Sequence, residues 1–269
     1  MTNASNLPDV QSESARPARS EVLAGIDRVK IPVLLPTGHK VIATLRVAAK
    51  VPTGHRGVHM SRLYRILAGT SDLPIGNLAE RVLETAKAQE TTELVATLAW
   101  EDLVVRDAPM TSSRGFHPYR VEMRAEWTET AGVTLRTRVE SAAMLACPCS
   151  KALSGDLGFH NQRGILQAEV DGDQVPRISD LLAAIDASAS NRVHPVLRRE
   201  DEKEVIDILS RTDSFRFVED AATCLLDALD AAAFAGASIH VRSMESIHAH
   251  DAVAWAGSRG QEMSEGIVV

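Results

Sequence analysis

Two neighbouring stretches of alternating apolar and polar side chains constrain the fold of this chain more than any other feature of its sequence. In residues 120–127 and again in residues 133–140, apolar or small side chains occupy every second position, and charged or polar side chains lie between them. This period of two is that of a β-strand with one buried face and one solvated face. Because the short segment 128–132 joins the two stretches, the sequence predicts a β-hairpin.

Other patterns add strands and helices on both sides of this hairpin. Apolar spacing predicts helices over residues 60–67, 78–86, 178–185, 205–209 and 218–233, and strands over residues 29–35, 41–47, 94–100, 165–170, 238–243 and 246–255. We expect Gly236 to end the last helix. The chain therefore falls in the α+β class, with two comparable halves that suggest two related domains. The polar residues 1–20 are expected to form a mobile tail.

Composition excludes several classes of protein. A net charge of −7 is the opposite of the basic excess that nucleic-acid binders usually show. No apolar run approaches the length of a membrane span, and the N-terminus does not read as a signal sequence, so we expect no membrane partner. Three cysteines, two of them almost adjacent, do not make a disulfide framework, and a reducing cytoplasm is the expected location.

A cysteine motif follows the hairpin and is the first candidate for chemistry. Cys147, Pro148 and Cys149 are followed by Lys151 and, shortly after, by His160. Proline fixes its own φ and favours an extended residue before it, so we expect both sulfurs on a stiff, non-helical segment. A thiolate beside an imidazole suits a transition metal or a nucleophile pair, but buried free cysteines are also common core residues. Both interpretations remain open from the spacing alone.

Three further clusters have a functional and a structural interpretation each. His248 and His250 would share one face of a strand, which suits a metal or proton transfer, although surface strands also carry histidines by chance. The segment 59–62 opens a predicted helix and could bind an anion or simply cap that helix. The charge run 199–203 reads as a solvated helix start, and Cys224 as a small core residue.

The combination is more specific than its parts. In chain order, the sequence carries Cys-Pro-Cys-Ser-Lys at 147–151, His-Asn-Gln-Arg at 160–163, Asp-Glu-Lys at 201–203, Phe-Val-Glu-Asp at 217–220 and Glu-Ser-Ile-His-Ala-His at 245–250. This series resembles GTP cyclohydrolase of the type IB class, a tunnelling-fold family. The segments 59–62 and 8–11 fit the same pattern, so the resemblance runs from near residue 8 to near residue 255.

The resemblance implies an overall activity and architecture. It implies conversion of GTP and water to 7,8-dihydroneopterin triphosphate and formate, the first step toward folate-type pterins. It also implies a homotetramer whose subunits each hold two tandem tunnelling-fold (T-fold) units, every unit an antiparallel sheet packed with helices. We expect the first unit over residues 21–146, and the second, with most of the active site, over residues 147–269.

The resemblance also implies roles for individual residues. Cys147, His160 and Glu202 would hold a divalent metal, most simply Zn²⁺, with Mn²⁺ or Fe²⁺ as alternatives. Which of Cys147 and Cys149 is the ligand stays open. The residues implied in catalysis are Cys147, Glu245, His248 and His250, the two histidines moving protons and Glu245 orienting one of them. The residues implied in GTP binding are Glu219 at the guanine edge and, elsewhere on the substrate, His59, Ser61, Arg62, Lys151 and Arg163.

Two alternatives lie outside this activity. Another tunnelling-fold purine or pterin enzyme, such as a cyclohydrolase with a cyclic phosphate product, would share the metal ligands and Glu219. A non-catalytic purine-binding or metal-storage protein would bind GTP or zinc without releasing formate. Candidate acids and bases beside candidate metal ligands argue against simple storage, because mere binding needs no proton transfer.

Overall fold

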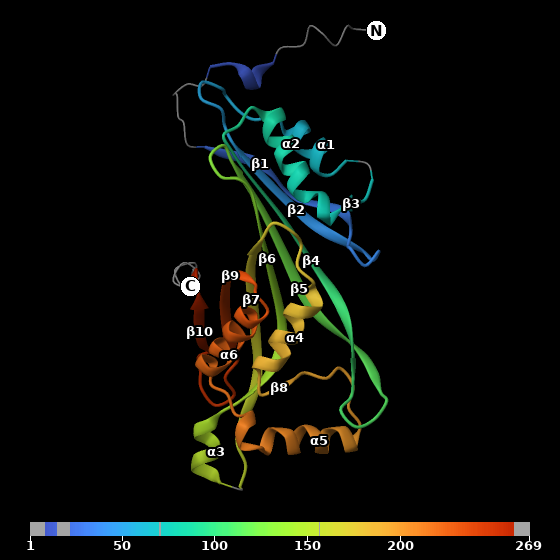
Figure 1. Cartoon of the computed structure of the whole chain (residues 1–269), viewed down its shortest axis with the longest axis vertical. Coiled ribbons are helices and arrows are strands. Elements are labelled where there is room, and N and C mark those ends of the chain that lie inside the picture. Colours follow the sequence, from blue (N-terminus) through green and yellow to red (C-terminus); the bar gives the residue numbers. More distant parts are fainter. Residues whose placement is uncertain (1–8, 15–21, 70, 156, 261–269) are drawn as a thin grey trace. The chain divides into compact units, whose positions relative to one another are not determined.

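The computed structural model describes residues 9–14, 22–69, 71–155 and 157–260, and it divides into two compact units. Unit 1 comprises the described residues up to Trp100, together with Glu122–Leu135 and Asp173–Val175. Unit 2 comprises Glu101–Val121, Arg136–Gly172 and the described residues from Pro176 onward. The α+β class is confirmed: the described residues contain six α-helices and a large mixed sheet (Figure 1). The predicted division into two tandem T-fold units at residue 146 stays a prediction.

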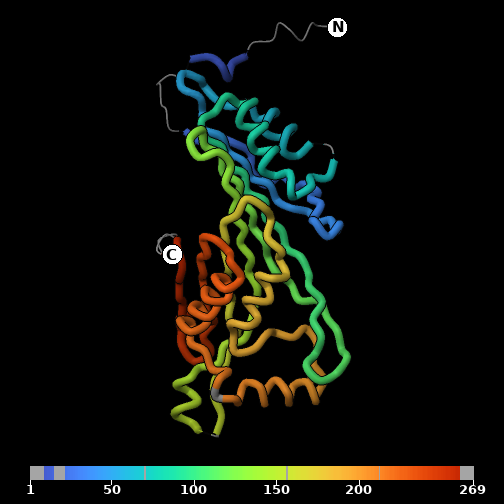
Figure 2. The backbone as a smooth tube through the Cα atoms, in the orientation of Figure 1, coloured from blue at the N-terminus to red at the C-terminus, as the bar shows by residue number. Residues whose placement is uncertain are grey.

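Unit 1 packs two helices on the strands of the first part of the chain. Its own elements are β1 (Leu23–Leu34), β2 (Lys40–Lys50), α1 (Met60–Leu67), β3 (Leu73–Pro74) and α2 (Leu78–Gln89). β1 and β2 form an antiparallel pair, and β3 adds to β1 in parallel. Helices α1 and α2 lie side by side (Figure 2). The core between helices and strands is formed by fully buried side chains, among them Leu45, Leu63, Leu67, Leu78 and Leu94.

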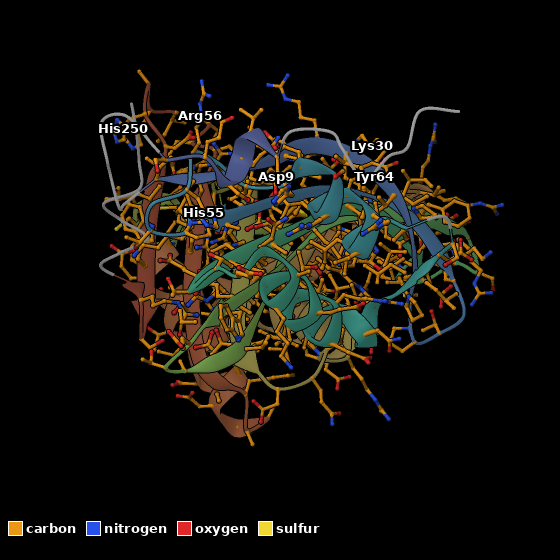
Figure 3. All side chains as sticks on the ribbon, turned by 90° about the horizontal axis from the view of Figure 1, so that it is seen from above. Asp9, Lys30, His55, Arg56, Tyr64 and His250 are labelled. Atoms are coloured by element: carbon orange, nitrogen blue, oxygen red, sulfur yellow. The ribbon has the colours of Figure 1, made fainter. Side chains whose placement is uncertain are left out.

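The described part of the predicted tail packs against the loop before α1. Residues Val10–Ser12 form a short 3-10 turn, and the Gln11 carbonyl accepts hydrogen bonds from the backbone N–H groups of Arg56 and Gly57. Arg56 also forms an ion pair with Glu13, and Figure 3 labels Arg56 and its neighbour His55. Residues 9–14 therefore contact the loop before α1, and the mobility of the tail stays a prediction. Its remaining residues, 1–8 and 15–20, lie outside the described ranges.

Three long strands contribute residues to both units. They are β4 (Glu93–Asp107), β5 (Arg114–Thr128) and β6 (Gly132–Ala146), and they are neighbours in the sheet. The hairpin predicted from the alternating stretches is confirmed as β5 and β6. Val121, Met123 and Ala125 are buried on β5, and the residues between them are partly or fully exposed. Gly132 opens β6 with φ 75°, a conformation that costs glycine little.

Unit 2 completes its sheet with the C-terminal strands. Its elements are α3 (Pro148–Ser154), β7 (Asn161–Gly172), α4 (Ile178–Ser188), β8 (Asn191–Arg192), α5 (Arg199–Ser210), α6 (Val218–Ala231), β9 (Ala235–Ser243) and β10 (Ala252–Gly257). The strand order in this unit is β10-β9-β7-β6-β5-β4, with β8 paired to β6. Helices α4 and α6 pack against each other, and α6 covers β9 and β10 (Figure 1). Leu166, Leu181, Ile185, Leu225 and Ile239 are fully buried between these layers.

Two sequence expectations about the end of the chain are wrong. The last helix ends at Ala231 rather than at Gly236, and Gly236 lies in β9. Glycine suits this position for another reason, since its φ is 58° and a Cβ there would lie 2.3 Å from Asp171 Oδ2. The strand predicted over residues 246–255 begins only at Ala252. Ala252 pairs with Ser243 in the antiparallel β9–β10 ladder, so the eight residues between them must form the connecting loop. None of the described helices is long and apolar enough to span a membrane.

Candidate functional site

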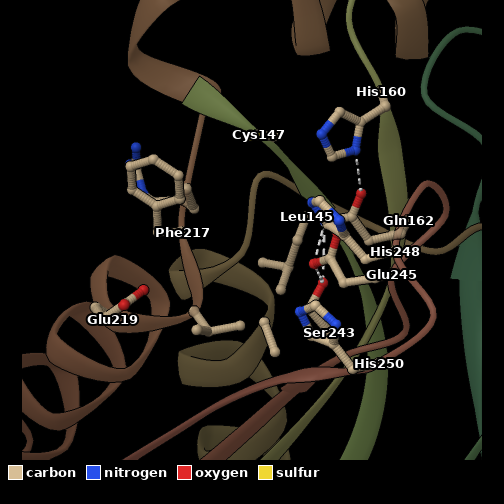
Figure 4. A pocket seen from close by; sticks show the side chains of 13 residues that line it. Leu145, Cys147, His160, Gln162, Phe217, Glu219, Ser243, Glu245, His248 and His250 are labelled. Atoms are coloured by element: carbon tan, nitrogen blue, oxygen red, sulfur yellow. Dashed lines mark hydrogen bonds between the residues drawn. The ribbon is translucent and has the colours of Figure 1, made fainter. Parts of the chain in front are cut away.

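A pocket of about 260 Å³ in unit 2 collects half of the site residues that the sequence singled out. Five segments meet there: the end of β6, the start of β7, the start of α6, the end of β9 and the loop between β9 and β10 (Figure 4). The lining residues are Leu145, Cys147, His160, Gln162, Arg216, Phe217, Val218, Glu219, Ser243, Glu245, His248, His250 and Ala252. The structure therefore brings together the predicted residues Cys147, His160, Glu219, Glu245, His248 and His250.

Cys147 enters the pocket at the point where a strand turns into a helix. It follows β6 in an extended conformation (φ −72°, ψ 120°) and is the N-cap of α3, with Pro148 at the first helical position. Its backbone N–H donates to the carbonyl oxygen of His160 at 3.3 Å, which keeps the two residues adjacent. The prediction of a non-helical segment is therefore wrong after Cys147, because Cys149 lies inside α3. Cys149 is exposed and is not among the pocket-lining residues.

A hydrogen-bond network connects one imidazole of the pocket to its carboxylate. His160 Nδ1 lies 3.0 Å from Gln162 Oε1. The side-chain nitrogen of Gln162 donates to Ser243 Oγ at 2.9 Å and to Glu245 Oε1 at 3.1 Å. Ser243 Oγ donates to the same Glu245 oxygen at 2.8 Å. Register brings these residues together, because β7 pairs with β9 so that Gly164 lies opposite Ser243.

His248 and His250 approach the pocket from the loop, not from a strand. Their rings stack with centroids 5.2 Å apart and an interplanar angle of 21°. The prediction that they share the face of a strand is wrong, since this part of the chain is the β9–β10 connection. Both imidazoles are exposed and line the pocket all the same, so water and a ligand can reach them.

The start of α6 supplies a different group of side chains. Glu219 is exposed in the first turn of the helix, and Phe217 is its N-cap residue (Figure 4). Arg216 precedes them, and its Nη1 donates hydrogen bonds to the carbonyl oxygens of Asp213 and Phe215. Its Nε is buried and has no hydrogen-bond partner among the residues that the structure describes. Sequence reasoning missed Arg216, Phe217 and Gln162 as lining residues, although each lies inside or beside a motif that it had found.

Three other predicted residues of unit 2 do not line the pocket. Glu202 is exposed in the first turn of α5, and its neighbour Asp201 is the buried carboxylate. Burial acts to raise the pKa of Asp201, but hydrogen bonds from the backbone of residue 198 and from Thr111 and Met110 lower that pKa well below its usual range. Lys151 lies in α3, and its Nζ donates to the carbonyl oxygen of Gly155, the C-cap residue of the same helix. Arg163 is exposed on β7.

The remaining predicted residues belong to unit 1. His59 is the N-cap residue of α1 without making a side-chain cap, and Ser61 and Arg62 lie in the first turn. The buried Gln89 accepts from the backbone N–H of His59 at 3.0 Å and donates to its carbonyl at 2.8 Å. Arg62 donates to the Ala88 carbonyl at the end of α2. The start of α1 is thus held firmly by the end of α2.

The donor chemistry of the pocket fits a divalent metal only in part. A thiol and an imidazole, from Cys147 and His160, are suitable zinc ligands and line the same pocket. The expected third ligand, Glu202, is not among the lining residues. Within the described residues, no three His, Cys, Asp or Glu side chains are arranged so that they could hold a metal ion.

Comparison with known proteins identifies the family. Residues 7–254 match the family described as type I GTP cyclohydrolase FolE2. A GTP cyclohydrolase FolE2 of Nitratidesulfovibrio vulgaris is 29% identical over 92% of this chain and 96% of its own length. One from an Exiguobacterium species is 32% identical over 86% of this chain and 80% of its own. The crystal structure of uricase from Arthrobacter globiformis matches 89% of this chain and 94% of that chain with a TM-score of 0.44 and 6% identity, too weak a likeness to support an inference. With a family match over almost its whole length, the chain belongs to the type I GTP cyclohydrolase FolE2 family and is a hydrolase.

Proposed function

We propose that the pocket of unit 2 is where this enzyme hydrolyses GTP to 7,8-dihydroneopterin triphosphate and formate. GTP cyclohydrolase I activity, the entry to folate biosynthesis, follows from the family to which the chain belongs. The observation that carries the proposal is the convergence of the Cys147 thiol, three imidazoles and two carboxylates on one pocket. This chemistry is what a hydrolysis with several proton transfers requires. We also propose the finer assignment to the type IB class, with two tandem T-fold units in a homotetramer and a cytoplasmic location.

The size of the pocket suggests which part of GTP enters it. About 260 Å³ is slightly below the roughly 300–1,000 Å³ of pockets that enclose a drug-sized ligand. We therefore expect the purine to enter and the triphosphate to extend outside. Glu219 would accept hydrogen bonds from N1–H and the 2-amino group of guanine, a pair of donors that a carboxylate matches with its two oxygens. Phe217, beside it, offers an aromatic face to the base.

Proton transfer is assigned to the histidines across the pocket. His248 and His250 are exposed to the pocket on a loop, within reach of a bound purine, so either can give or accept a proton at the ring that opens. Glu245 is fixed by Ser243 and Gln162 and helps to orient the imidazoles around it. For the triphosphate we propose Lys151 and Arg163, and we add Arg216, a cation that lines the pocket. The roles of Arg62 toward the triphosphate and of His59 and Ser61 toward the substrate stay predictions, because these residues belong to unit 1.

A divalent metal remains part of the proposal, with Cys147 and His160 as its first two ligands. Bound there, Zn²⁺, Mn²⁺ or Fe²⁺ would supply a water molecule of lowered pKa. Glu202 is the proposed third ligand. Because it is exposed on α5 and outside the pocket lining, α5 would have to present it differently when the metal binds.

The test is to incubate metal-reconstituted protein with GTP and to measure formate and, after oxidation and phosphatase treatment, fluorescent neopterin. We expect both products in equal amounts, and we expect chelation to stop their release. A cyclic phosphate product would instead indicate a different cyclohydrolase. Cys147→Ala should abolish formate release, whereas Cys224→Ala, a half-buried cysteine on α6, should retain it. Full activity of Cys147→Ala would refute the assignment of this pocket.

A further inference from the structure

Gln162 occupies the centre of the pocket network, between His160 and Glu245. It is the second residue of β7, and its amide contacts three side chains. Its oxygen lies 3.0 Å from His160 Nδ1, and its nitrogen lies 2.9 Å from Ser243 Oγ and 3.1 Å from Glu245 Oε1 (Figure 4). An amide has one acceptor oxygen and one donor nitrogen, so the direction in which it points decides what each neighbour must do.

The chemistry of the neighbours determines that direction. An ionised Glu245 carboxylate can only accept hydrogen bonds, so it must face the amide NH₂. The Ser243 hydroxyl donates its one hydrogen to Glu245 Oε1 at 2.8 Å, so toward Gln162 it can only accept a hydrogen bond. Both contacts require the NH₂ group on the side of Glu245 and Ser243. The amide oxygen of Gln162 must therefore face His160.

This orientation has a consequence for the imidazole. The Gln162 oxygen is an acceptor, so His160 Nδ1 must carry the hydrogen, and the neutral ring then has its lone pair on Nε2. Ser246 Oγ lies farther from the same Nδ1, at 3.4 Å. Its hydroxyl oxygen can accept a second, weaker hydrogen bond from the Nδ1–H group. Neither contact competes for Nε2.

We propose that Gln162 is a positioning residue that holds His160 as the Nδ1–H tautomer and leaves Nε2 as the nitrogen that can bind a metal or accept a proton. Glu245 acts on His160 through Gln162, since its carboxylate keeps the amide turned. Histidines that bind metals generally donate their other ring N–H to a fixed acceptor, which sets both the tautomer and the direction of the ring. The use of this tautomer in catalysis rests on the proposed function, whereas the tautomer itself rests on the hydrogen bonds alone.

The tautomer can be measured without activity and without metal. We would label histidine with ¹⁵N in the full-length, metal-free protein and record two-bond ¹H–¹⁵N correlations at mildly alkaline pH, identifying His160 by comparison with His160→Gln. We expect a protonated Nδ1 and an unprotonated Nε2 in the unmodified protein. A ring with its hydrogen on Nε2 would overturn the proposal. The tautomer itself is read from the unmodified protein, and the His160→Gln variant serves only to assign the signal.

Two substitutions test whether Gln162 is the cause. Gln162→Leu removes the acceptor and should shift His160 toward the Nε2–H tautomer. Gln167→Leu is the matched control, because Gln167 lies on the same strand and donates to Glu140 at 3.3 Å, outside the pocket lining. It should leave the His160 signal unchanged. A Gln162→Leu protein with the unmodified tautomer would refute the causal role.

Zinc titration connects the tautomer to the metal. We expect Gln162→Leu to weaken Zn²⁺ binding by about 10- to 100-fold, the usual effect of losing a partner of a metal-binding histidine, with no change in Gln167→Leu. Equal zinc affinity in Gln162→Leu and the unmodified protein would overturn the role toward the metal. If the unmodified protein carries Nδ1–H but does not convert GTP, the proposed function fails and the positioning role stands. If it converts GTP but carries Nε2–H, only the positioning role fails.

Discussion

Replacing the buried His117 should make the stability of the protein less sensitive to acid. His117 lies on β5, is 3% exposed, and has Nε2 2.9 Å from Ser141 Oγ. Burial, together with the positive charges of Arg106 and Arg163 and with His194, lowers the pKa of His117 from 6.5 to about 4. The folded protein therefore holds this imidazole neutral, whereas the unfolded chain takes up a proton near pH 6.5.

The sign and size of the effect follow from these two pKa values. Because the folded-state pKa of the histidine is the lower one, its contribution is present above pH 6.5 and is lost as the pH falls toward about 4. The whole shift corresponds to about 3 kcal/mol, at about 1.4 kcal/mol for each pH unit. Between about pH 7 and about pH 5, linkage gives a loss of about 2 kcal/mol in the free energy of unfolding.

The assay compares His117→Asn with the unmodified protein by urea unfolding at these two pH values. Asparagine can still hydrogen-bond Ser141 but does not titrate. Between about pH 7 and about pH 5, the free energy of unfolding of the variant should therefore fall by about 2 kcal/mol less than that of the unmodified protein. Other groups titrate in both proteins and cancel in the comparison, including His194 and His240, whose pKa values burial also lowers. Following the His117 ring by NMR gives its pKa directly. Parallel pH dependence of the two proteins, or a measured pKa near 6.5, would refute the reasoning.

Two further predictions concern charged groups of unit 2. Asp186→Asn should lower the free energy of unfolding by about 3–5 kcal/mol, because it leaves the 4%-exposed Arg106 side chain without its ion-pair partner at 2.7 Å. The control Asp107→Asn, from an ion pair with both side chains exposed, should cost less than about 1 kcal/mol, and equal losses would contradict the argument from burial. Glu219→Gln should raise the KM for GTP by about 10- to 100-fold with a smaller change in kcat, because hydrogen bonds to a charged group contribute about 1.5–3 kcal/mol. Formate release measures both constants, with the exposed Glu200→Gln as control; an unchanged KM would remove Glu219 from the guanine site.

Local patterns in the sequence were sufficient where neighbours along the chain decide the structure. The β5–β6 hairpin follows from the alternation of apolar and polar residues, which places the apolar side chains on the buried face of the sheet. Helix α6 follows from apolar residues at helical spacing. The extended conformation of Cys147 follows from the proline after it. The α-helix that begins at Pro148 was not predicted, although proline is well suited to a first helical position.

Strand pairing between distant segments decided which residues line the pocket and contact one another. The sequence by itself determined the α+β class, the hairpin and the set of chemical groups, because these depend on local spacing and on residue type. The tertiary structure decided that His248 and His250 leave the strand for a loop, since the pairing of Ala252 with Ser243 requires a connection there. It also decided that Gln162 meets Glu245, because β7 and β9 are neighbours in a register that no local pattern encodes. Which residues were candidates could therefore be predicted from the chain, whereas which of them touch depended on long-range register.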